Sequence, residues 1–316
     1  MDPRALIRPV KRVVRRRYGW LPLYELRNKV RYGHTVPRIW LFERAEARRL
    51  RSAMPQLSQS TRLNESAQPS QPQKPPLVTT VIPTYRRPDG LAAAVRSALD
   101  QTVRDHLVIV VDDGGGLPDL PPDPRLVAVS LAHNTHVLGV VRNVGIRLAR
   151  SEYVAFLDDD NTWEPNHLET AIGVLSKESP RDLQGVYTAM RRVFPDGREL
   201  DILSVPYDRH AAREDGFLDA NAFVGRRSRA LWFSRMRRDL GVLPREDWAT
   251  FYRYSRRHPI RHIPVPTVRY LVNPDTYYTV WGPEADSVDE TPSSASPSAS
   301  ASAQPTADAG AGVANG

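Results

Sequence analysis

Two groups of carboxylates follow apolar segments that have the length and composition of buried strands. Asp112 and Asp113 come directly after the aliphatic run Leu107–Val111, and a run of three aspartates comes directly after Tyr153–Leu157. In open α/β sheets, ligands bind beyond the carboxyl ends of the strands. The sequence therefore predicts that both groups point into one binding crevice.

The run of three aspartates, Asp158 to Asp160, is the strongest candidate for a metal site. Adjacent carboxylates repel one another, and a divalent cation would offset that repulsion. Asp158 and Asp160 face the same side of an extended backbone, and Mg²⁺ or Mn²⁺ prefers carboxylate oxygen and often shares its ligands with substrate phosphates. The alternative is a solvated acidic loop, which is the common meaning of an exposed charge run. The position directly after a buried strand favours the metal site.

Alternating strands and helices position these carboxylates in the first half of the chain. Apolar, β-branched runs predict strands, and apolar residues at three- and four-residue spacing predict helices between them. We expect Pro83 to end the first strand, Asp89 to cap the first helix, and Pro165 to lie in the first turn of the last helix. The alternation predicts a mostly parallel central sheet flanked by helices, an α/β fold. The predicted strands are Leu77–Ile82, Leu107–Val111, Leu126–Leu131 and Tyr153–Leu157, and one predicted helix is Gly139–Ala149.

The second half of the chain is less regular. Two apolar runs, Val186–Val193 and Arg198–Leu203, flank a Pro-Asp-Gly turn and predict a hairpin. Glu246–Arg257 reads as a helix that carries three aromatic residues. Arg226 and Arg227 are either a phosphate or acidic-acceptor contact or a solvated surface pair.

Several of these segments resemble the motifs of family 2 glycosyltransferases, in order and at the right spacing over about residues 77–180. The last of them resembles the family's Asp-x-Asp segment. Each motif alone is weak, but five in succession agree with the fold argued from periodicity. The matching segments are Val81–Arg87, Ala98–Thr102, Val110–Gly114, Gly139–Ile146 and Phe156–Asn161, followed by Trp163, Pro165 and Leu168.

The resemblance implies a GT-A fold and an inverting transfer of a sugar from a nucleotide-diphosphate donor to an acceptor hydroxyl. It also implies a divalent metal, Mn²⁺ or Mg²⁺, and most often a UDP-sugar. By similarity, Asp160 would bind the metal with Asp158 beside it, and the remaining residues would surround the nucleotide. Those nucleotide-site residues are Pro83, Thr84, Tyr85, Asp112, Arg142, Asp158 and Asp159.

The family also places a catalytic carboxylate late in the chain, before an aromatic residue. Glu246-Asp247-Trp248 matches that pattern, so the resemblance implies that Asp247 is the general base that takes the acceptor proton. The alternative is that both acids only favour the positive N-terminus of their helix. Departures from the family pattern occur at Gly115 and Gly116, where serine is usual after Asp-Asp-Gly, and they leave the selectivity for the nucleobase open.

Composition divides the chain into four parts. Residues 1–51 hold 15 Lys and Arg against 4 Asp and Glu, so the net charge of +8 comes from this segment. There is no cysteine, which excludes disulfides, zinc–thiolate sites and cysteine nucleophiles. We predict a basic, aromatic extension (1–54), a Pro/Ser/Gln-rich linker (55–76), a GT-A domain (77–282) and a disordered tail (283–316). Within the domain, residues 77–180 would bind the nucleotide-sugar and residues 181–282 the acceptor.

No secretory signal and no run of about 18 apolar residues is visible, so we predict a cytoplasmic protein. The basic extension is either an interfacial segment that contacts anionic lipid at the inner membrane face or a pair of helices packed on the core.

Three rival functions remain open. A nucleotidyl- or phosphotransferase would need a glycine-rich phosphate loop with lysine, which the sequence lacks. A nucleic-acid binder would use the basic extension, but an acidic crevice repels phosphates, so no nucleic acid is expected as a partner. A catalytically inactive relative that only binds nucleotide-sugar is the third alternative.

Overall fold

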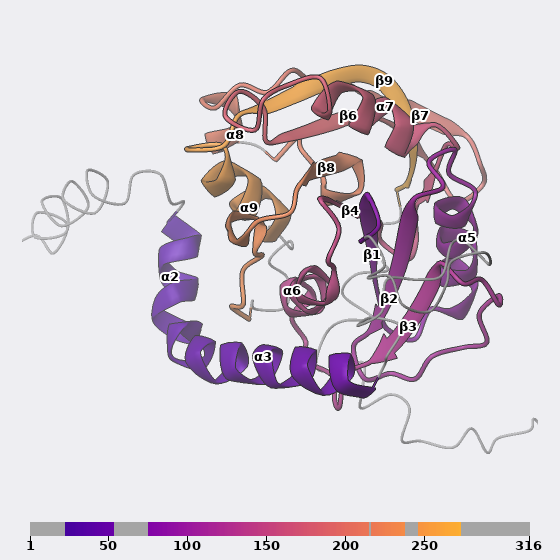
Figure 1. The fold of residues 1–316 in the computed structure, drawn as a ribbon. Helices are drawn as coiled ribbons and strands as arrows, with labels where there is room; N and C mark the ends of the chain where they lie inside the picture. The colour runs from indigo at the N-terminus through magenta and orange to yellow at the C-terminus, as the bar shows by residue number, and fades with distance from the viewer. Residues whose placement is uncertain (1–22, 54–74, 215, 238–245, 273–316) are drawn as a thin grey trace, which may run out of the picture.

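The structure is a computed structural model that describes residues 23–53, 75–214, 216–237 and 246–272 (Figure 1). A single mixed sheet runs through these residues in the order β3-β2-β1-β4-β8-β6-β9-β5, with β7 paired to β6. The predicted α/β fold, with helices around a central sheet, is confirmed.

The first four strands form the parallel half of the sheet. Strand β1 pairs in parallel with β2 and β4, and β2 pairs in parallel with β3. Every residue of β1, β2 and β4 is buried, as expected for strands covered on both faces. All four strands lie within two residues of their predicted ends. They span Val78–Thr84 (β1), His106–Asp112 (β2), Leu126–Ser130 (β3) and Tyr153–Phe156 (β4).

The prediction that Pro83 ends the first strand is wrong, because β1 continues to Thr84. Pairing between β1 and β4 ends at Val81, whose carbonyl accepts from the backbone N–H of Leu157 at 3.1 Å. Pro83 lies two residues further on and its backbone faces the same side, beyond the paired region. Its missing N–H therefore costs no ladder hydrogen bond.

The other half of the sheet is mixed, so the pairing is parallel throughout only in the first half. Strand β8 pairs antiparallel with both β4 and β6, while β6 pairs in parallel with β9. The predicted hairpin is confirmed as β6 and β7, joined through a turn in which Gly197 has φ +86°. The strands are Thr162–Trp163 (β5), Gly185–Val193 (β6), Glu199–Leu203 (β7), Phe223–Arg226 (β8) and Ile260–Leu271 (β9).

Helix α6 begins and ends within one residue of the predicted Gly139–Ala149. Two details of other helices differ. Asp89 lies in the first turn of α5, whose N-cap is Arg87 and whose first residue is Pro88. Pro165 precedes the N-cap Asn166 of α7 instead of lying in its first turn. The helices are α5 (Pro88–Leu99), α6 (Leu138–Leu148), α7 (His167–Leu175), α8 (Ala211–Glu214) and α9 (Glu246–Tyr254), with 3-10 turns at η2 (Ala220–Ala222) and η3 (Arg229–Leu231).

Helix α9 begins at the predicted residue but ends at Tyr254, three residues before the predicted Arg257. Residues 255–257 continue as turns whose N–H groups still donate to carbonyls of the last helical residues. The aromatic side of α9 packs into the core through Phe251 and Tyr254.

Two N-terminal helices, α2 (Leu23–Tyr32) and α3 (Val36–Ala53), are joined by η1 (Gly33–Thr35). Figure 1 shows α3 lying across the lower side of the molecule beneath α6. The carboxylate of Glu43 is fully buried there and accepts from Asn143 (3.0 Å), Arg147 (2.6 Å) and Arg235 (2.6 Å). Helix α3 of the extension therefore packs on the core.

The predictions for residues 1–22, most of the linker 55–76 and the tail 283–316 lie outside the described residues. No helix among the described residues combines the length and the apolar character needed to cross a membrane.

Candidate functional site

Asp112 ends β2 and anchors the glycine turn that follows it. Its oxygens accept from the N–H groups of Gly115 (3.1 Å) and Gly116 (2.9 Å) and from the Ser130 hydroxyl (2.6 Å). Gly114 has φ +78°, and a Cβ there would lie 2.5 Å from backbone of His133, so only glycine fits. Asp112 is fully buried with three donors, and its predicted nucleotide contact stays a prediction.

The neighbouring Asp113 points into the protein. It accepts from the backbone N–H of Thr135 at 2.9 Å and from its hydroxyl at 3.1 Å. Burial raises the pKa of Asp113 to about 8 despite these hydrogen bonds. Asp113 therefore tends to hold a proton near neutral pH, and its contacts are those of a structural residue.

Pro83, Thr84 and Tyr85, which the resemblance places around the nucleotide, lie at the carboxyl end of β1 and are almost fully buried. The guanidinium of Arg86 lies 5.1 Å from the centre of the Tyr85 ring. A Cβ on Gly115 would be 2.8 Å from the same ring, so the tyrosine packs directly on the glycine turn. These contacts bring the ends of β1 and β2 together.

Asp159 and Asp160 share one cation but differ in exposure. Arg87 Nη1 lies 3.2 Å from Asp159 Oδ1 and 2.8 Å from Asp160 Oδ2. Asp159 also accepts from the hydroxyl of Thr84 at 2.8 Å, and burial raises its pKa to about 7. The Asp160 side chain remains 27% exposed, so it is the member of the pair that a ligand can reach.

Arg142 is the cation at the centre of the site. It is buried in α6, and it donates to Asp158 Oδ1 at 2.6 Å and to Glu246 Oε1 at 2.9 Å. Its guanidinium also lies 5.0 Å from the centre of the Phe233 ring. The charges of Asp158 and Glu246 raise the pKa of Arg142 although burial lowers it. Arg142 thus joins the end of β4 to the start of α9.

Asp247, the predicted base, lies beside this group in the first turn of α9. Its Oδ1 accepts from the backbone N–H of Trp248 at 2.7 Å. Burial raises the pKa of Asp247 well above its usual range, and the charges of Asp219 and Glu246 raise it further. A carboxylate with a raised pKa is a better proton acceptor, which is the property a general base needs.

Sequence reasoning missed three residues of this site. Asn221 accepts the backbone N–H of Asp158 at 2.6 Å and donates to its carboxylate at 2.9 Å. Asp219 accepts from Asn221 and has its pKa raised to about 6, by burial first and by the charge of Asp158. Tyr270, near the end of β9, has its pKa raised by the charges of four carboxylates and by burial. Those carboxylates are Asp219, Asp158, Asp160 and Asp247.

The carboxylates outnumber the cations that neutralise them. Arg87 and Arg142 pair with Asp158, Asp159, Asp160 and Glu246, and the charges of Asp219 and Asp247 add to the same region. Burial raises the pKa of Asp160, and the charge of Asp158 raises it further. This repulsion fits a cation held jointly by Asp158, Asp160 and a ligand. Within the described part of the chain, no group of three or more carboxylates or histidines could hold a metal alone.

Arg226 and Arg227, considered from the sequence as phosphate or acceptor contacts, lie away from these carboxylates. Arg226 pairs with Glu152 at 2.7 Å and donates to the carbonyl of Leu175 at 3.0 Å. Arg227 donates to the carbonyl of Ser151 at 2.7 Å. Both contacts lie near the amino end of β4, so neither arginine reaches the site at its carboxyl end.

Residues 79–199 match the family model described as Glycosyl transferase family 2. The match begins in β1, runs through both aspartate groups and ends at the start of β7. The resemblance stated from the sequence motifs is therefore confirmed over this part of the chain.

Named glycosyltransferases are among the relatives. TuaG of Bacillus subtilis (strain 168), named for teichuronic acid biosynthesis, is 32% identical over 40% of this chain and 51% of its own length. WfaP of Escherichia coli, a "UDP-Glc:alpha-D-GlcNAc-diphosphoundecaprenol beta-1,3-glucosyltransferase", is 28% identical over 32% of this chain and 42% of its own. The chain thus spans about half the length, or less, of these relatives.

Among solved structures, S. aureus TarS 1-349 is similar with a TM-score of 0.47 and 18% identity, covering 61% of this chain and 60% of that one.

Proposed function

We propose that the protein is an inverting glycosyltransferase that moves a sugar from a nucleoside-diphosphate sugar to an acceptor hydroxyl. The observation that carries the proposal is the convergence of two distant segments on Arg142. The guanidinium holds Asp158 from the Asp-x-Asp segment on one side and Glu246, the neighbour of Asp247, on the other. This arrangement brings the carboxylate that we propose to bind the donor close to the segment that carries the proposed base.

The donor would be held through its diphosphate. Asp158 and Asp160 are the residues that would hold Mn²⁺ or Mg²⁺, because their mutual repulsion calls for a cation. When bound, such a cation offsets the negative charge that builds on the departing diphosphate. A UDP-sugar is the donor we propose, and the name of the relative WfaP, a UDP-Glc-dependent glucosyltransferase, supports it.

Asp247 would act as the general base. Its carboxylate takes the proton of the acceptor hydroxyl while the acceptor oxygen forms a bond to the anomeric carbon. On the opposite face, the bond between that carbon and the phosphate oxygen breaks, and the nucleoside diphosphate leaves with the electron pair. In-line displacement of this kind inverts the anomeric carbon. The raised pKa of Asp247 suits it to hold the transferred proton.

The nucleoside would lie at the carboxyl ends of β1 and β2. We propose that Pro83, Thr84 and Tyr85 line this region and that Asp112 contacts the nucleobase. Arg142 and Asp159 would hold the neighbouring side chains in place. The buried hydrogen bonds of Asp112 and Asp159 support the positioning role, because a fixed carboxylate loses little freedom when a ligand binds.

The acceptor is proposed to be a saccharide hydroxyl of glycan or polysaccharide biosynthesis, since relatives such as TuaG are named for such pathways. It would meet the site through residues 181–272, which supply Asp219, Asp247 and Tyr270. A cytoplasmic location, with the basic extension against the inner membrane face, belongs to the same proposal.

The test is release of nucleoside diphosphate from a panel of UDP-, GDP-, CDP- and ADP-sugars, with Mn²⁺ or with EDTA. We expect turnover of one donor with Mn²⁺ and a loss of about 10²- to 10⁴-fold in Asp247→Asn. Asp182→Asn, a matched change at an exposed aspartate remote from the site, should keep the activity.

Equal turnover by the wild-type protein and Asp247→Asn would contradict the base assignment. No turnover of any donor, together with preserved nucleotide binding, would favour the inactive nucleotide-sugar-binding relative.

A further inference from the structure

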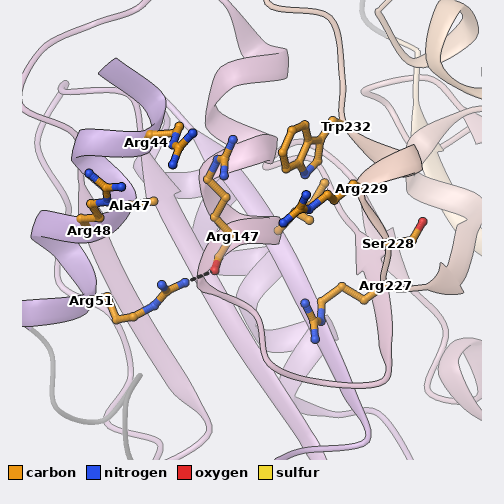
Figure 2. Close-up of a pocket in the computed structure, with 10 residues that line it drawn as sticks. Arg44, Ala47, Arg48, Arg51, Arg147, Arg227, Ser228, Arg229 and Trp232 are labelled. Atoms are coloured by element: carbon orange, nitrogen blue, oxygen red, sulfur yellow. Dashed lines mark hydrogen bonds between the residues drawn. The ribbon is translucent and has the colours of Figure 1, made fainter. Parts of the chain in front are cut away.

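A cavity of about 420 Å³ lies between α3, the last turn of α6 and the segment 227–232 (Figure 2). Figure 2 shows arginines from all three segments gathered around it, with Trp232 beside them. A volume in this range is typical of small-ligand sites. The arginines are Arg44, Arg48, Arg51, Arg147, Arg227 and Arg229.

The cavity lies at the opposite end of the parallel strands from the carboxylate site. Arg227 donates its backbone N–H to the carbonyl of Glu152 at 2.8 Å, directly before β4 begins. The carboxylate site lies where β4 ends, at Asp158. Arg142 and Arg147 lie more than one turn apart on α6, so the same helix contributes one arginine to each site.

The positive charge around the cavity is largely uncompensated. Among the described residues, no carboxylate forms an ion pair with Arg44, Arg48, Arg227 or Arg229, whereas Arg147 shares the buried Glu43 with Arg235. Burial lowers the pKa of Arg51, and the positive charges of Arg150, Arg147 and Arg227 lower it further. Cations gathered in one cavity repel one another unless an anion joins them.

The cavity also presents guanidinium groups that are held in place before any ligand arrives. Arg147 is fixed by Glu43 at 2.6 Å and by the Trp232 ring, whose centre is 4.3 Å away. Its Nη2 atom is buried and has no hydrogen-bond partner in the described part of the structure. A buried donor without a partner is costly, so this guanidinium is held by Glu43 and Trp232 at the expense of one unsatisfied N–H group.

We propose that this cavity binds a phosphate-bearing anion, with room for a diphosphate, at a second site on the molecule. Guanidinium groups present paired N–H donors that match phosphate oxygens, so an arginine cluster favours phosphate over a simple halide. The proposal depends on the cavity alone and holds whichever donor the carboxylate site uses.

Two sources could supply this phosphate. One is a soluble diphosphate, and the other is the headgroup of an anionic lipid. Leu41 is 60% exposed and lies three and seven residues before Arg44 and Arg48, on the same face of α3. An exposed leucine beside an arginine cavity is suited to a lipid surface, so the test includes both probes.

The experiment compares full-length wild-type protein with the double variant Arg48→Glu/Arg229→Glu, whose arginines are exposed and form no ion pair with a described residue. The matched control is Arg38→Glu/Arg104→Glu, which makes the same change of charge at exposed arginines outside the cavity. Binding of inorganic pyrophosphate is measured by calorimetry in EDTA, and binding to phosphatidylcholine vesicles with and without phosphatidylglycerol is measured by sedimentation. Circular dichroism and thermal melts check that each variant is folded.

We expect binding of at least one probe to weaken by about tenfold or more in the cavity variant and by less than about threefold in the control. Binding of pyrophosphate alone would identify a soluble phosphate as the ligand. Binding to phosphatidylglycerol vesicles alone would identify a lipid headgroup. Absence of wild-type binding to both probes, or equal weakening in the two variants, would overturn the proposal.

Discussion

At the scale of single residues, the site depends on one buried cation. The positive charge of Arg142 is shared by the carboxylates of Asp158 and Glu246, which both form ion pairs with it. Removing one partner of a buried ion pair costs about 3–5 kcal/mol, because the remaining charge is left in a poorly solvating environment. Motif similarity placed Arg142 near the nucleotide. Its contact with Glu246 spans 104 residues, and no local pattern reveals it.

Asp113 provides a prediction about pH. Its folded-state pKa of about 8 lies above the usual aspartate value, so the folded protein holds a proton that the unfolded chain releases. The stabilisation that protonated Asp113 gives the folded protein is therefore fully present below about pH 4 and is lost as the pH rises towards 8. We expect Asp113→Asn to remove this pH dependence. The free energy of unfolding of the variant minus that of the wild type should then increase by about 1.4 kcal/mol per pH unit between pH 5 and 7.

Urea denaturation at several pH values measures the effect. The exposed Asp182→Asn serves as a control and should follow the wild-type curve. Parallel curves for Asp113→Asn and the wild type would mean that Asp113 is ionised in the folded protein.

At the scale of elements, helix α5 touches the loop that carries the three aspartates. A Cβ on Gly90 would lie only 2.4 Å from the carbonyl oxygen of Asp159, so Gly90→Ala must displace this loop. We expect a loss of about 1–3 kcal/mol in stability and weaker metal-dependent nucleotide binding, because Asp160 moves with the loop. Thermal melts with and without nucleotide and Mn²⁺ measure both effects.

Gly173→Ala in α7 is the matched control, because no atom lies within 4 Å of the added methyl. It should be neutral or slightly stabilising, since alanine favours a helix interior. Gly90→Ala that behaves like Gly173→Ala would show that the helix can shift without disturbing the aspartates.

Sequence patterns predicted the parallel half of the sheet well because β1, β2 and β4 are buried runs separated by amphipathic helices. They did not predict β9. Its sequence contains Pro264 and Pro266, which usually argue against a strand, and its pairing with β6 shifts register near Thr188 and Ala189. That irregular pairing is a tertiary feature, and Tyr270 was missed with it.

The candidate site was predictable only where its residues belong to local sequence patterns. Asp158, Asp160 and Asp247 stand in short motifs that can be read locally. Asn221 lies in a 3-10 turn capped by Asp219, and its role depends on a contact with Asp158 that spans 63 residues. Periodicity contains no information about such contacts.

At the scale of the whole molecule, the N-terminal extension is tied to the core by one carboxylate. Glu43 is fully buried and faces Arg147 and Arg235. We expect Glu43→Gln to cost about 3–5 kcal/mol, because it leaves both arginines without their counter-charge. Urea denaturation measures the loss, and faster trypsin cleavage within α3 would show that the helix detaches.

Glu199→Gln is the control, since it breaks an ion pair whose carboxylate is 45% exposed and should cost no more than about 1 kcal/mol. Equal effects of the two substitutions would contradict the anchoring role of Glu43.

The measurement that most directly tests the central claim is thermal stability with nucleoside diphosphates, with and without Mn²⁺. A nucleotide at 100 times its Kd should stabilise by about 2.7 kcal/mol, a rise in Tm of about 5–11 °C. We predict that UDP gives this rise only with Mn²⁺, that Asp160→Asn abolishes it, and that Asp182→Asn and Arg48→Glu/Arg229→Glu keep it. Stabilisation that is unchanged without Mn²⁺ and in Asp160→Asn would contradict a donor site at the aspartates. So would the absence of stabilisation by any nucleotide.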